Sequence, residues 1–276
     1  MERKRESLDV SIVIPCSDDP LLEKCLQSID VDTDVIVALN APSPEVRNIL
    51  TKFPAVRTTE TNRRGIAPAY NLGIEEACSN TILLMDSDCV FESGTIERLY
   101  KLGLNHQVAK GRVVFQRRGA ISSAIASLRE YTTSNLVNAY SPPLLFDKKI
   151  VDKIGYYFHP DLIWSEDADF DRRVKKANIP IGYDPNAIIY HKALTLAEDL
   201  RSAFFYGVGR QIGKDAGIYA PHTFHSSLEN IWKVANNSIN IAHRKGLPVA
   251  AYYLLLWNTW FRMGTFIQHY IKKYGT

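Results

Sequence analysis

The chain has 276 residues, of which 46% are hydrophobic and 23% charged, and its formal net charge is +3. This length is sufficient for one large α/β domain with an appendage, and the composition is ordinary for a globular protein. This net charge is too small to indicate that the protein binds nucleic acid, so no nucleic-acid partner is expected. The four cysteines form no CxxC pair or zinc-site spacing, and residues 1–9 contain no apolar signal segment, so we expect a cytoplasmic protein.

In the first part of the chain, short apolar runs alternate with segments whose apolar residues recur at helical spacing. The run at 10–15 (VSIVIP) is continuously apolar and ends at a proline, which is typical of a buried strand in a parallel sheet. The alternation predicts βαβ units and a mostly parallel central sheet. The predicted strands are 10–15, 34–39, 56–59 and 81–85, and the predicted helices are 19–29, 44–53 and 67–78.

The pattern changes after Gly94. We expect this second part of the chain to cover one side of the same sheet. From residue 197 onward the sequence is helical in character, with a break predicted near Gly207, Gly217 and Pro221. The predicted strands of this part are 110–117, 144–146 and 188–191, and the predicted helices are 96–104, 121–137, 148–154 and 168–177.

The segment at 247–261 is rich in Leu, Ala, Tyr and Trp. It is shorter than the roughly 18–20 apolar residues that a membrane-spanning helix needs. A buried core helix is one interpretation. An interfacial helix is the other, because Trp257 and Trp260 are amphipathic anchors and Arg262 follows them.

Ligands of parallel α/β sheets bind beyond the carboxyl ends of the strands, so segments 15–19, 40–43 and 86–88 are expected to meet at one rim. Asp86 and Asp88 directly follow the predicted strand 81–85. Two carboxylates one residue apart can share a divalent cation, and hard cations such as Mg²⁺ and Mn²⁺ also take phosphate oxygens. A surface loop or a helix cap is the alternative explanation of such a triplet.

Further chemistry is predicted downstream of that triplet. The tandem pair Glu166–Asp167 comes just before a predicted helix, where acidic residues interact favourably with the helix dipole. A carboxylate in this position can also take the proton of an attacking hydroxyl, and the local sequence leaves both roles open. His191 closes the strand at 188–191, where a structural hydrogen bond and a metal-ligating imidazole both fit.

Taken together and in order, four segments resemble the inverting family-2 glycosyltransferases of GT-A fold. VSIVIPCSDDPLLEKCLQSI resembles their first strand and helix, NRRGIAPAYNLGIEEAC their asparagine–glycine–asparagine region, and ILLMDSDCVF their metal-binding acidic triplet. The block at 144–191, with its Glu–Asp pair, Arg173 and final His191, resembles their acceptor-side region. The resemblance implies an α/β GT-A fold with a mostly parallel sheet and a helical C-terminal extension.

The resemblance also implies roles for the matched residues. Asp86 and Asp88 would handle the nucleotide ribose, the diphosphate and a Mn²⁺ or Mg²⁺ ion, and His191 would complete the metal shell. Asp167 would be the base of a single-displacement, inverting transfer. The remaining expected substrate contacts are Pro15 and Ser17 at the nucleotide base, Arg63 or Arg64 at the diphosphate, Gly65 and Asn71 in the asparagine–glycine–asparagine region, and Glu166 beside the base.

The sequence departs from the family pattern at several positions. Asn40 stands where an acidic residue commonly contacts the nucleoside, Tyr70 where a basic residue is common, and Asn178 in place of a common glycine. Because an asparagine can still bond a uracil or ribose edge, Asn40 is retained as a substrate-binding candidate and a UDP-sugar donor is favoured. No QxxRW motif follows His191, which indicates addition of a single sugar rather than polymerisation.

The expected acceptor is a glycan or a lipid-linked sugar, in glycan, polysaccharide or glycolipid assembly. Trp164 could form a sugar-stacking platform with nearby aromatic residues, or these residues could be core. A lipid-linked acceptor would place the protein at the cytoplasmic face of a membrane, and a homodimer is a further expectation. We predict a catalytic domain over 1–195, with a nucleotide-sugar half at 9–105 and an acceptor half at 106–195, followed by a helical region at 196–276.

Two other functions are consistent with parts of the sequence. DSDCVF fits the signature of haloacid-dehalogenase-like phosphatases, in which Asp86 would be the nucleophile. That nucleophile normally ends the first strand of its domain, whereas about 85 residues with several predicted strands precede Asp86. The other alternative is an inactive GT-A domain that serves as a binding or scaffold subunit, against which the retained Asp88, Asp167 and His191 argue.

Overall fold

The computed structural model describes residues 6–130, 137–220 and 249–274. These residues form two compact units. The first contains 1–115, 130–161 and 166–192, and the second contains 116–129, 162–165 and 193–276. The predicted boundary at 195/196 stays a prediction.

The first unit is built on one eight-stranded sheet with the strand order β3-β2-β1-β4-β7-β6-β8-β5. Strands β1 to β4 pair in parallel where they are neighbours, as do β6 and β8, whereas β7 and β5 run antiparallel to their neighbours. The strands are β1 (Ser7–Cys16), β2 (Asp32–Asn40), β3 (Arg57–Thr61), β4 (Thr81–Leu84), β5 (Cys89–Phe91), β6 (Val108–Phe115), β7 (Leu144–Asp147) and β8 (Ile181–His191).

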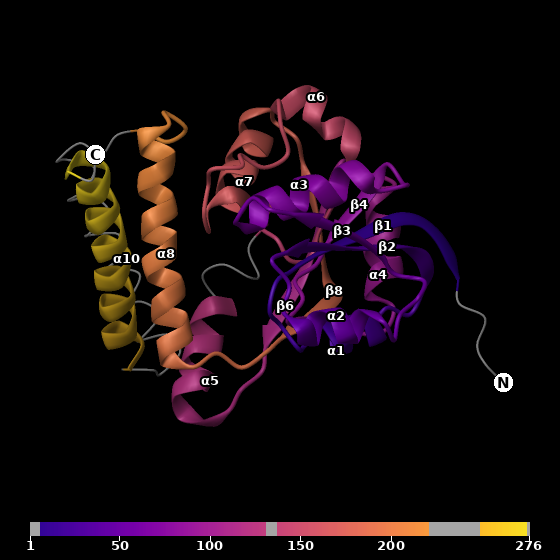
Figure 1. Ribbon diagram of the computed structural model, residues 1–276, viewed down its shortest axis with the longest axis horizontal. Coiled ribbons are helices and arrows are strands. Elements are labelled where there is room, and N and C mark those ends of the chain that lie inside the picture. The colour runs from indigo at the N-terminus through magenta and orange to yellow at the C-terminus, as the bar shows by residue number, and fades with distance from the viewer. Residues whose placement is uncertain (1–5, 131–136, 221–248, 275–276) are drawn as a thin grey trace. The chain divides into compact units, whose positions relative to one another are not determined.

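Helix α3 covers one face of the β1–β4 part of this sheet, and α1 and α2 cover the other (Figure 1). The core beneath α3 joins apolar side chains of the strands to Tyr70 and to the stacked rings of Phe158 and Phe170. The helical elements of this unit are α1 (Leu22–Gln27), α2 (Pro44–Leu50), α3 (Ile66–Glu76), α4 (Thr95–Gly103), a 3₁₀ turn (Lys148–Ile150), α6 (Val151–Ile154) and α7 (Glu166–Lys176).

The predicted strands and helices of this unit are present, with shifted ends. One strand was missed: β5 has only three residues, too few to show an alternating pattern. The predicted helix 121–137 is wrong in its extent, because α5 spans Gly119–Arg129 and Val137 lies in a bend. Residues 131–136 of that prediction lie outside the described residues.

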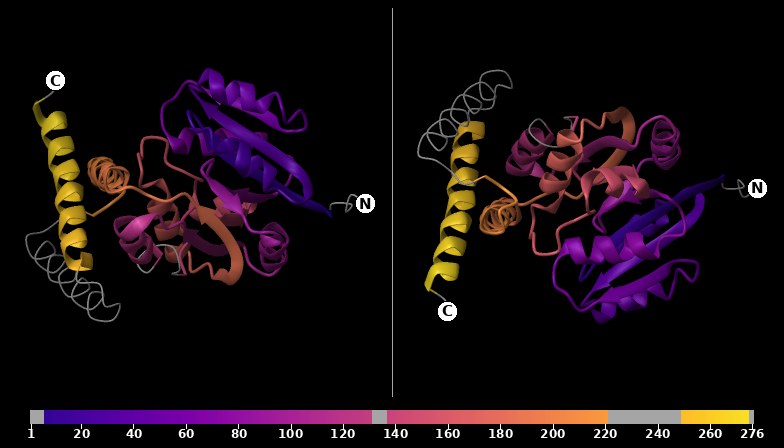
Figure 2. Two further views of the ribbon diagram at one scale, coloured as in Figure 1. Left: turned by 90° about the horizontal axis from the view of Figure 1, so that it is seen from below. Right: turned by 90° about the horizontal axis from the view of Figure 1, so that it is seen from above.

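The second unit contains α5, α8 (Leu196–Asp215) and α10 (Val249–Tyr274). Helices α8 and α10 lie side by side in both views of Figure 2. The predicted break near Gly207, Gly217 and Pro221 is confirmed at Gly217, which follows the end of α8 at Asp215. It is wrong at Gly207, because α8 is continuous through it, and Pro221 lies outside the described residues. A Cβ at Gly207 would lie 1.9 Å from the carbonyl oxygen of Phe261, so the glycine permits close helix packing rather than a break.

A buried polar cluster holds this second unit together. Asp199 is fully buried, and it pairs with the Arg129 guanidinium, whose Nε donates at 2.6 Å, and accepts from the Tyr253 hydroxyl. A buried carboxylate is stable only with such partners. Among the described residues, no helix has the length and apolar character needed to cross a membrane.

Candidate active site

The carboxyl ends of β1 and β2 carry the first predicted donor-site residues. Pro15 is buried within β1 in register with Ala38, and Ser17 follows the strand as an exposed residue. The Ser17 carbonyl accepts a 3.0 Å hydrogen bond from the Ser43 N–H, which ties the two strand exits together. Asn40, half-buried at the end of β2, donates through Nδ2 to the Arg63 carbonyl.

Asp86 follows β4 at the same rim and is held by an aromatic hydroxyl. Tyr70, fully buried on α3, donates to Asp86 Oδ1 at 2.7 Å, and its hydroxyl also lies 3.1 Å from Ser141 Oγ. Burial, reinforced by the negative charge of Asp88, raises the pKa of Asp86 to about 7, and the Tyr70 hydrogen bond opposes this rise. Asp86 is therefore a carboxylate whose charge needs a positive partner.

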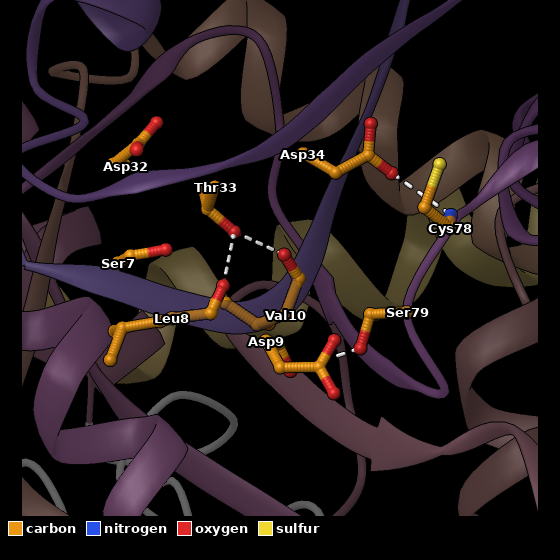
Figure 3. Close-up of a pocket in the computed structure, with 9 residues that line it drawn as sticks. All are labelled: Ser7, Leu8, Asp9, Val10, Asp32, Thr33, Asp34, Cys78 and Ser79. Atoms are coloured by element: carbon orange, nitrogen blue, oxygen red, sulfur yellow. Dashed lines mark hydrogen bonds between the residues drawn. The ribbon is translucent and has the colours of Figure 1, made fainter.

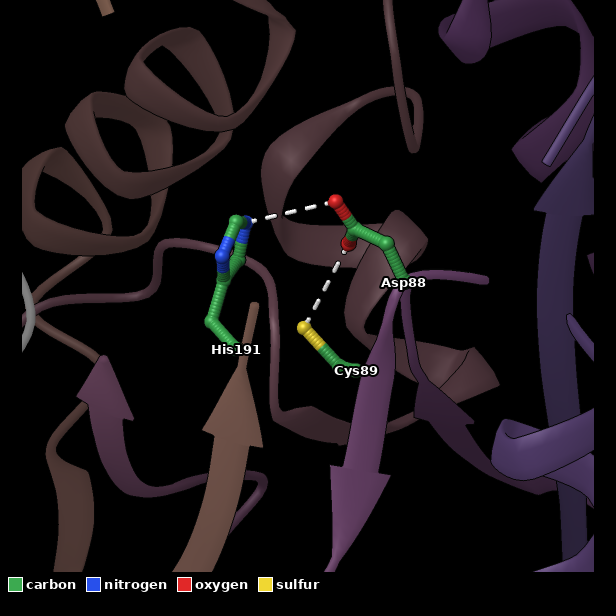
Figure 4. Close-up of side chains that lie close together, drawn as sticks. All are labelled: Asp88, Cys89 and His191. Carbon is green, nitrogen blue, oxygen red and sulfur yellow. Dashed lines mark hydrogen bonds and ion pairs between the residues drawn. The ribbon is translucent and has the colours of Figure 1, made fainter. Parts of the chain in front are cut away.

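Asp88 and His191 meet where β5 begins and β8 ends. The antiparallel register pairs Cys89 with His191, so the residue before Cys89 reaches the imidazole (Figure 4). Asp88 Oδ2 lies 3.5 Å from His191 Nε2 and 3.4 Å from Lys192 Nζ. His191 Nδ1 lies 2.9 Å from the Lys192 carbonyl oxygen, which can only accept, so Nδ1 is the donor in this contact and Nε2 is the ring nitrogen that faces Asp88.

This arrangement fits a divalent cation bound through oxygen and nitrogen. Ligand atoms of Asp88, Cys89 and His191 all lie within 4.8 Å of one another. Burial raises the pKa of the Cys89 thiol well above its usual value. Mn²⁺ and Mg²⁺ favour oxygen ligands, so the thiol is the least suitable of the three groups. A carboxylate with an imidazole suits Mn²⁺ better than Mg²⁺, which prefers oxygen ligands. Asp86 lies outside this group of ligand atoms.

Asp167 lies in the first turn of α7, beside a buried lysine. Burial raises the pKa of Asp167 to about 6, against the opposing effects of a 2.6 Å hydrogen bond from the Ala168 N–H and the positive charge of Lys110. Lys110, 1% exposed on β6, donates to the Tyr140 carbonyl at 2.8 Å. Burial lowers its pKa to about 8, while Asp167 and Asp171 act to raise it. Near neutral pH, Asp167 is thus an ionised carboxylate of enhanced basicity.

The start of α7 is fixed by ion pairs one turn further along. Asp169 is fully buried and accepts from Arg173 Nε at 2.8 Å and from Arg172 Nη2 at 2.7 Å. Arg173 also donates to the Tyr157 carbonyl at 2.6 Å, which anchors the preceding loop. Glu166 is buried beside Asp167. This network holds the helix terminus, and hence Asp167, in one position.

The asparagine–glycine–asparagine region lies around the start of α3. Asn71 uses both ends of its amide on one backbone unit, since Oδ1 accepts from the Phe158 N–H at 3.1 Å and Nδ2 donates to the Phe158 carbonyl at 2.8 Å. Gly65 is the N-cap of α3. Arg63 and Arg64 are exposed, and Arg63 pairs with Asp161 at 2.5 Å. The substrate contacts predicted for these residues stay predictions.

Trp164 belongs to the second unit. It has a left-handed backbone (φ 59°), and its ring stacks on Phe205 at 5.9 Å and meets Tyr206 edge-on at 5.6 Å. The side chain is 41% exposed. It is a partly accessible aromatic face, and its acceptor role stays a prediction.

A cavity of about 350 Å³ lies at the opposite, amino-terminal ends of β1 and β2 (Figure 3). It contains no predicted site residue. Its lining residues are Ser7, Leu8, Asp9, Val10, Asp32, Thr33, Asp34, Cys78 and Ser79.

The family is decided by a sequence match over residues 11–158, about half of the chain, to the family described as Glycosyl transferase family 2. The chain belongs to that family. The matched region of this glycosyltransferase contains the donor-side rim with Asp86 and Asp88 and ends before Asp167. A comparison with curated proteins finds no match.

Solved structures of other proteins have a similar fold. The structure of TarS 1–349 from S. aureus aligns with a TM-score of 0.54 and 14% identity, covering 98% of this chain and 92% of that one. The mannosyltransferase PcManGT from Pyrobaculum calidifontis, in complex with GDP-Man and Mn²⁺, aligns with a TM-score of 0.57 and 18% identity, covering 95% and 84%. These likenesses confirm the predicted α/β GT-A fold.

Several residues of this candidate site were not indicated by the sequence. Tyr70 was noted only as a departure, and Lys110 only as part of a strand. Asp19 was not singled out either. Burial raises its pKa, and it lies within electrostatic range of Asp88, Lys192 and His191. The sequence alone did not distinguish Lys110, because its strand contains a second cation, Arg112, two residues further on.

Proposed function

We propose that this glycosyltransferase moves one sugar from a nucleoside-diphosphate sugar to an acceptor hydroxyl in a single, inverting displacement. The acceptor oxygen forms a bond to the anomeric carbon as the bond from that carbon to the diphosphate breaks. The acceptor proton passes to Asp167, and the nucleoside diphosphate leaves with the bonding electron pair. One displacement at the anomeric carbon inverts its configuration.

Asp88 and His191 are the proposed ligands of a Mn²⁺ or Mg²⁺ ion, and Asp86 is the proposed contact to the ribose and diphosphate. The bound ion would neutralise charge on the leaving diphosphate. The 3.5 Å approach of Asp88 Oδ2 to His191 Nε2 supports this assignment. The pKa values of the nearby carboxyl groups of Asp86 and Asp167 are raised, as expected for a site that binds a cation.

The observation that carries the proposal is the environment of Asp167. Its pKa of about 6 makes it a stronger proton acceptor than an ordinary aspartate, yet leaves it ionised at neutral pH. Asp167 and Asp88 both act electrostatically on Asp86, so the proposed base and the proposed donor contacts are close in space.

A UDP-sugar is the favoured donor. TarS has been solved with UDP-GlcNAc and with UDP, whereas PcManGT has been solved with GDP-Man, so the fold accommodates both nucleotides. Asn40 would face the nucleoside in this chain. The proposed acceptor is a glycan or a lipid-linked sugar that receives a single residue.

The proposal is tested by thermal shift of the full chain against UDP- and GDP-sugars, with Mn²⁺ or with EDTA. A ligand that binds only the folded state raises the melting temperature. We expect the sugars of one of the two nucleotides to raise it in the presence of Mn²⁺ but not in the presence of EDTA. Asp88→Ala should abolish the metal-dependent shift, whereas Asp32→Ala, a change to an exposed aspartate on β2 at the sheet's amino-terminal end, should leave it unchanged. An unchanged Mn²⁺ dependence in Asp88→Ala would contradict the metal assignment.

Turnover separates transfer from binding alone. Once the thermal-shift experiment has identified the donor, NMR of the glycosylated product can determine its anomeric configuration. We expect this configuration to be opposite to that of the donor. Donor binding with neither transfer nor slow hydrolysis would instead support a binding or scaffold subunit. The phosphatase alternative, which uses Asp86 as a nucleophile, is not retained because the chain is a glycosyltransferase by family.

A further inference from the structure

Helix α10 exposes a broad apolar face. Its fully described part, from Tyr252 to Lys272, contains many large hydrophobic side chains that are at least a third exposed. Soluble monomers rarely expose so many together, and such patches mark interaction surfaces. The residues are Tyr252, Leu255, Leu256, Trp260, Met263, Phe266, Ile267, Tyr270 and Ile271.

These side chains lie on one side of the helix. Successive members are separated by one, three or four residues, which on a helix of 3.6 residues per turn gives a continuous stripe. The opposite side is already packed within the second unit. Tyr253 is buried against Ile125 and Leu128 of α5, and a Cβ at Gly264 would lie 2.0 Å from the Phe204 carbonyl of α8. The exposed stripe is therefore a second apolar face, separate from the core.

The charges on α10 are of one sign. The helix sequence contains no Asp or Glu. Arg262 is exposed and, seven residues after Leu255, borders the stripe, whereas Lys272 lies on the α8 side, with its Nζ 3.6 Å from Asp215 Oδ2. Trp260, Tyr252 and Tyr270 combine apolar rings with polar tips, the side-chain type enriched at the boundary between lipid headgroups and acyl chains. Apolar and aromatic side chains with flanking cations are complementary to an anionic lipid surface.

A second copy of the chain fits this face less well. Two α10 helices paired on their apolar stripes would place Arg262 of both copies at the border of the interface, and α10 has no carboxylate to neutralise it. Like charges placed together in this way oppose association.

We propose that α10 docks in the plane of an anionic lipid bilayer, with its stripe from Tyr252 to Ile271 buried at the headgroup–acyl boundary and Arg262 near the lipid phosphates. This inference depends on the second unit alone. It is independent of the transfer chemistry proposed for the first.

The test is co-sedimentation of the full chain with vesicles of phosphatidylcholine alone and of phosphatidylcholine mixed with phosphatidylglycerol. We expect the protein to sediment with the anionic vesicles and about fivefold less with the neutral ones. The double variant Leu255→Glu/Phe266→Glu should lose at least about tenfold in partitioning, because both charges fall within the stripe.

The chain offers a matched control. Leu104 and Ile121 are 68% and 59% exposed, the same values as Leu255 and Phe266, but lie outside α10. Leu104→Glu/Ile121→Glu should sediment like the wild type, and circular-dichroism melting should show that both double variants are folded. Equal sedimentation of the two double variants would overturn the proposal, as would failure of the wild type to bind anionic vesicles. A wild-type dimer that Leu255→Glu/Phe266→Glu makes monomeric, without vesicle binding, would assign the stripe to a second copy instead.

Discussion

The hydroxyl of Tyr70 donates a 2.7 Å hydrogen bond to Asp86 Oδ1 from a fully buried position on α3. A hydrogen bond to a charged group contributes about 1.5–3 kcal/mol. Tyr70→Phe should therefore lower kcat/KM for the donor by about tenfold to a hundredfold, because Asp86 loses the partner that orients it. Steady-state kinetics over a range of donor concentrations measure this.

Tyr157→Phe is the matched control for Tyr70→Phe. Tyr157 packs against the same core, and its hydroxyl donates to the Lys148 carbonyl at 3.0 Å rather than to a site carboxylate. Its loss should leave kcat/KM within about twofold of the wild type. Equal effects of the two substitutions would mean that Tyr70 acts only through packing.

The His191 imidazole is predicted to be needed for metal affinity. His191→Ala removes the Nε2 that faces Asp88, so the Mn²⁺ concentration for half-maximal activity should rise by about tenfold or more. His106→Ala is the control, since His106 is also half-buried and its Nδ1 bonds the Leu102 carbonyl away from the rim. A Mn²⁺ titration of both variants that gives the same midpoint would remove His191 from the metal shell.

Activity should depend on pH through Asp167. The base must be ionised, and its pKa is about 6, so kcat should fall as the pH falls through about 6. Lys110→Met removes the positive charge that lowers this pKa. The pKa must then rise, and the midpoint of the acid limb should move upward by about one unit.

The control for Lys110→Met is Lys148→Met, because Lys148 Nζ also donates to a backbone carbonyl, that of Ala77, at 2.7 Å. Its pH profile should keep the wild-type midpoint. Profiles of kcat against pH that coincide for all three proteins would show that Lys110 has only a structural role.

Close packing of α3 on β1 should depend on Gly73. A Cβ at this position would lie 2.4 Å from Val13 Cγ1. Overpacking of this kind costs about 1–3 kcal/mol, so Gly73→Ala should lower the urea midpoint of unfolding. Adding Val13→Ala removes the clashing methyl groups, and the double variant should be more stable than the sum of the two single effects predicts. Strict additivity would contradict the contact.

Much of the segment 9–105 could be predicted from sequence, because buried parallel strands have continuous apolar sequences. VSIVIP and TILLM indicated β1 and β4, and with them the rim at which Asp86 and Asp88 lie. The approach of Asp88 to His191 could not be predicted in the same way. It depends on β5, whose three residues are specified by pairing with β8 rather than by their own pattern.

The positions of buried residues that act through tertiary contacts could not be predicted from sequence either. Lys110 stands in a strand, where a lysine is ordinarily an exposed residue, and only the tertiary structure places it beside Asp167 and Asp171. Gly207 was taken for a helix break because a glycine lowers helix propensity, whereas the approach of α10 explains its presence. Local sequence patterns report strand and helix type, but such contacts arise between distant segments.

Single-turnover transfer by Asp167→Asn tests the central claim most directly. The asparagine retains the shape of the side chain and an oxygen that can accept from the Ala168 N–H, but it is not a base. The account predicts wild-type affinity for the donor and Mn²⁺, with the rate of sugar transfer lowered by about a hundredfold or more. A transfer rate within a few-fold of the wild type, with the donor still bound, would contradict the assignment of Asp167 as the base.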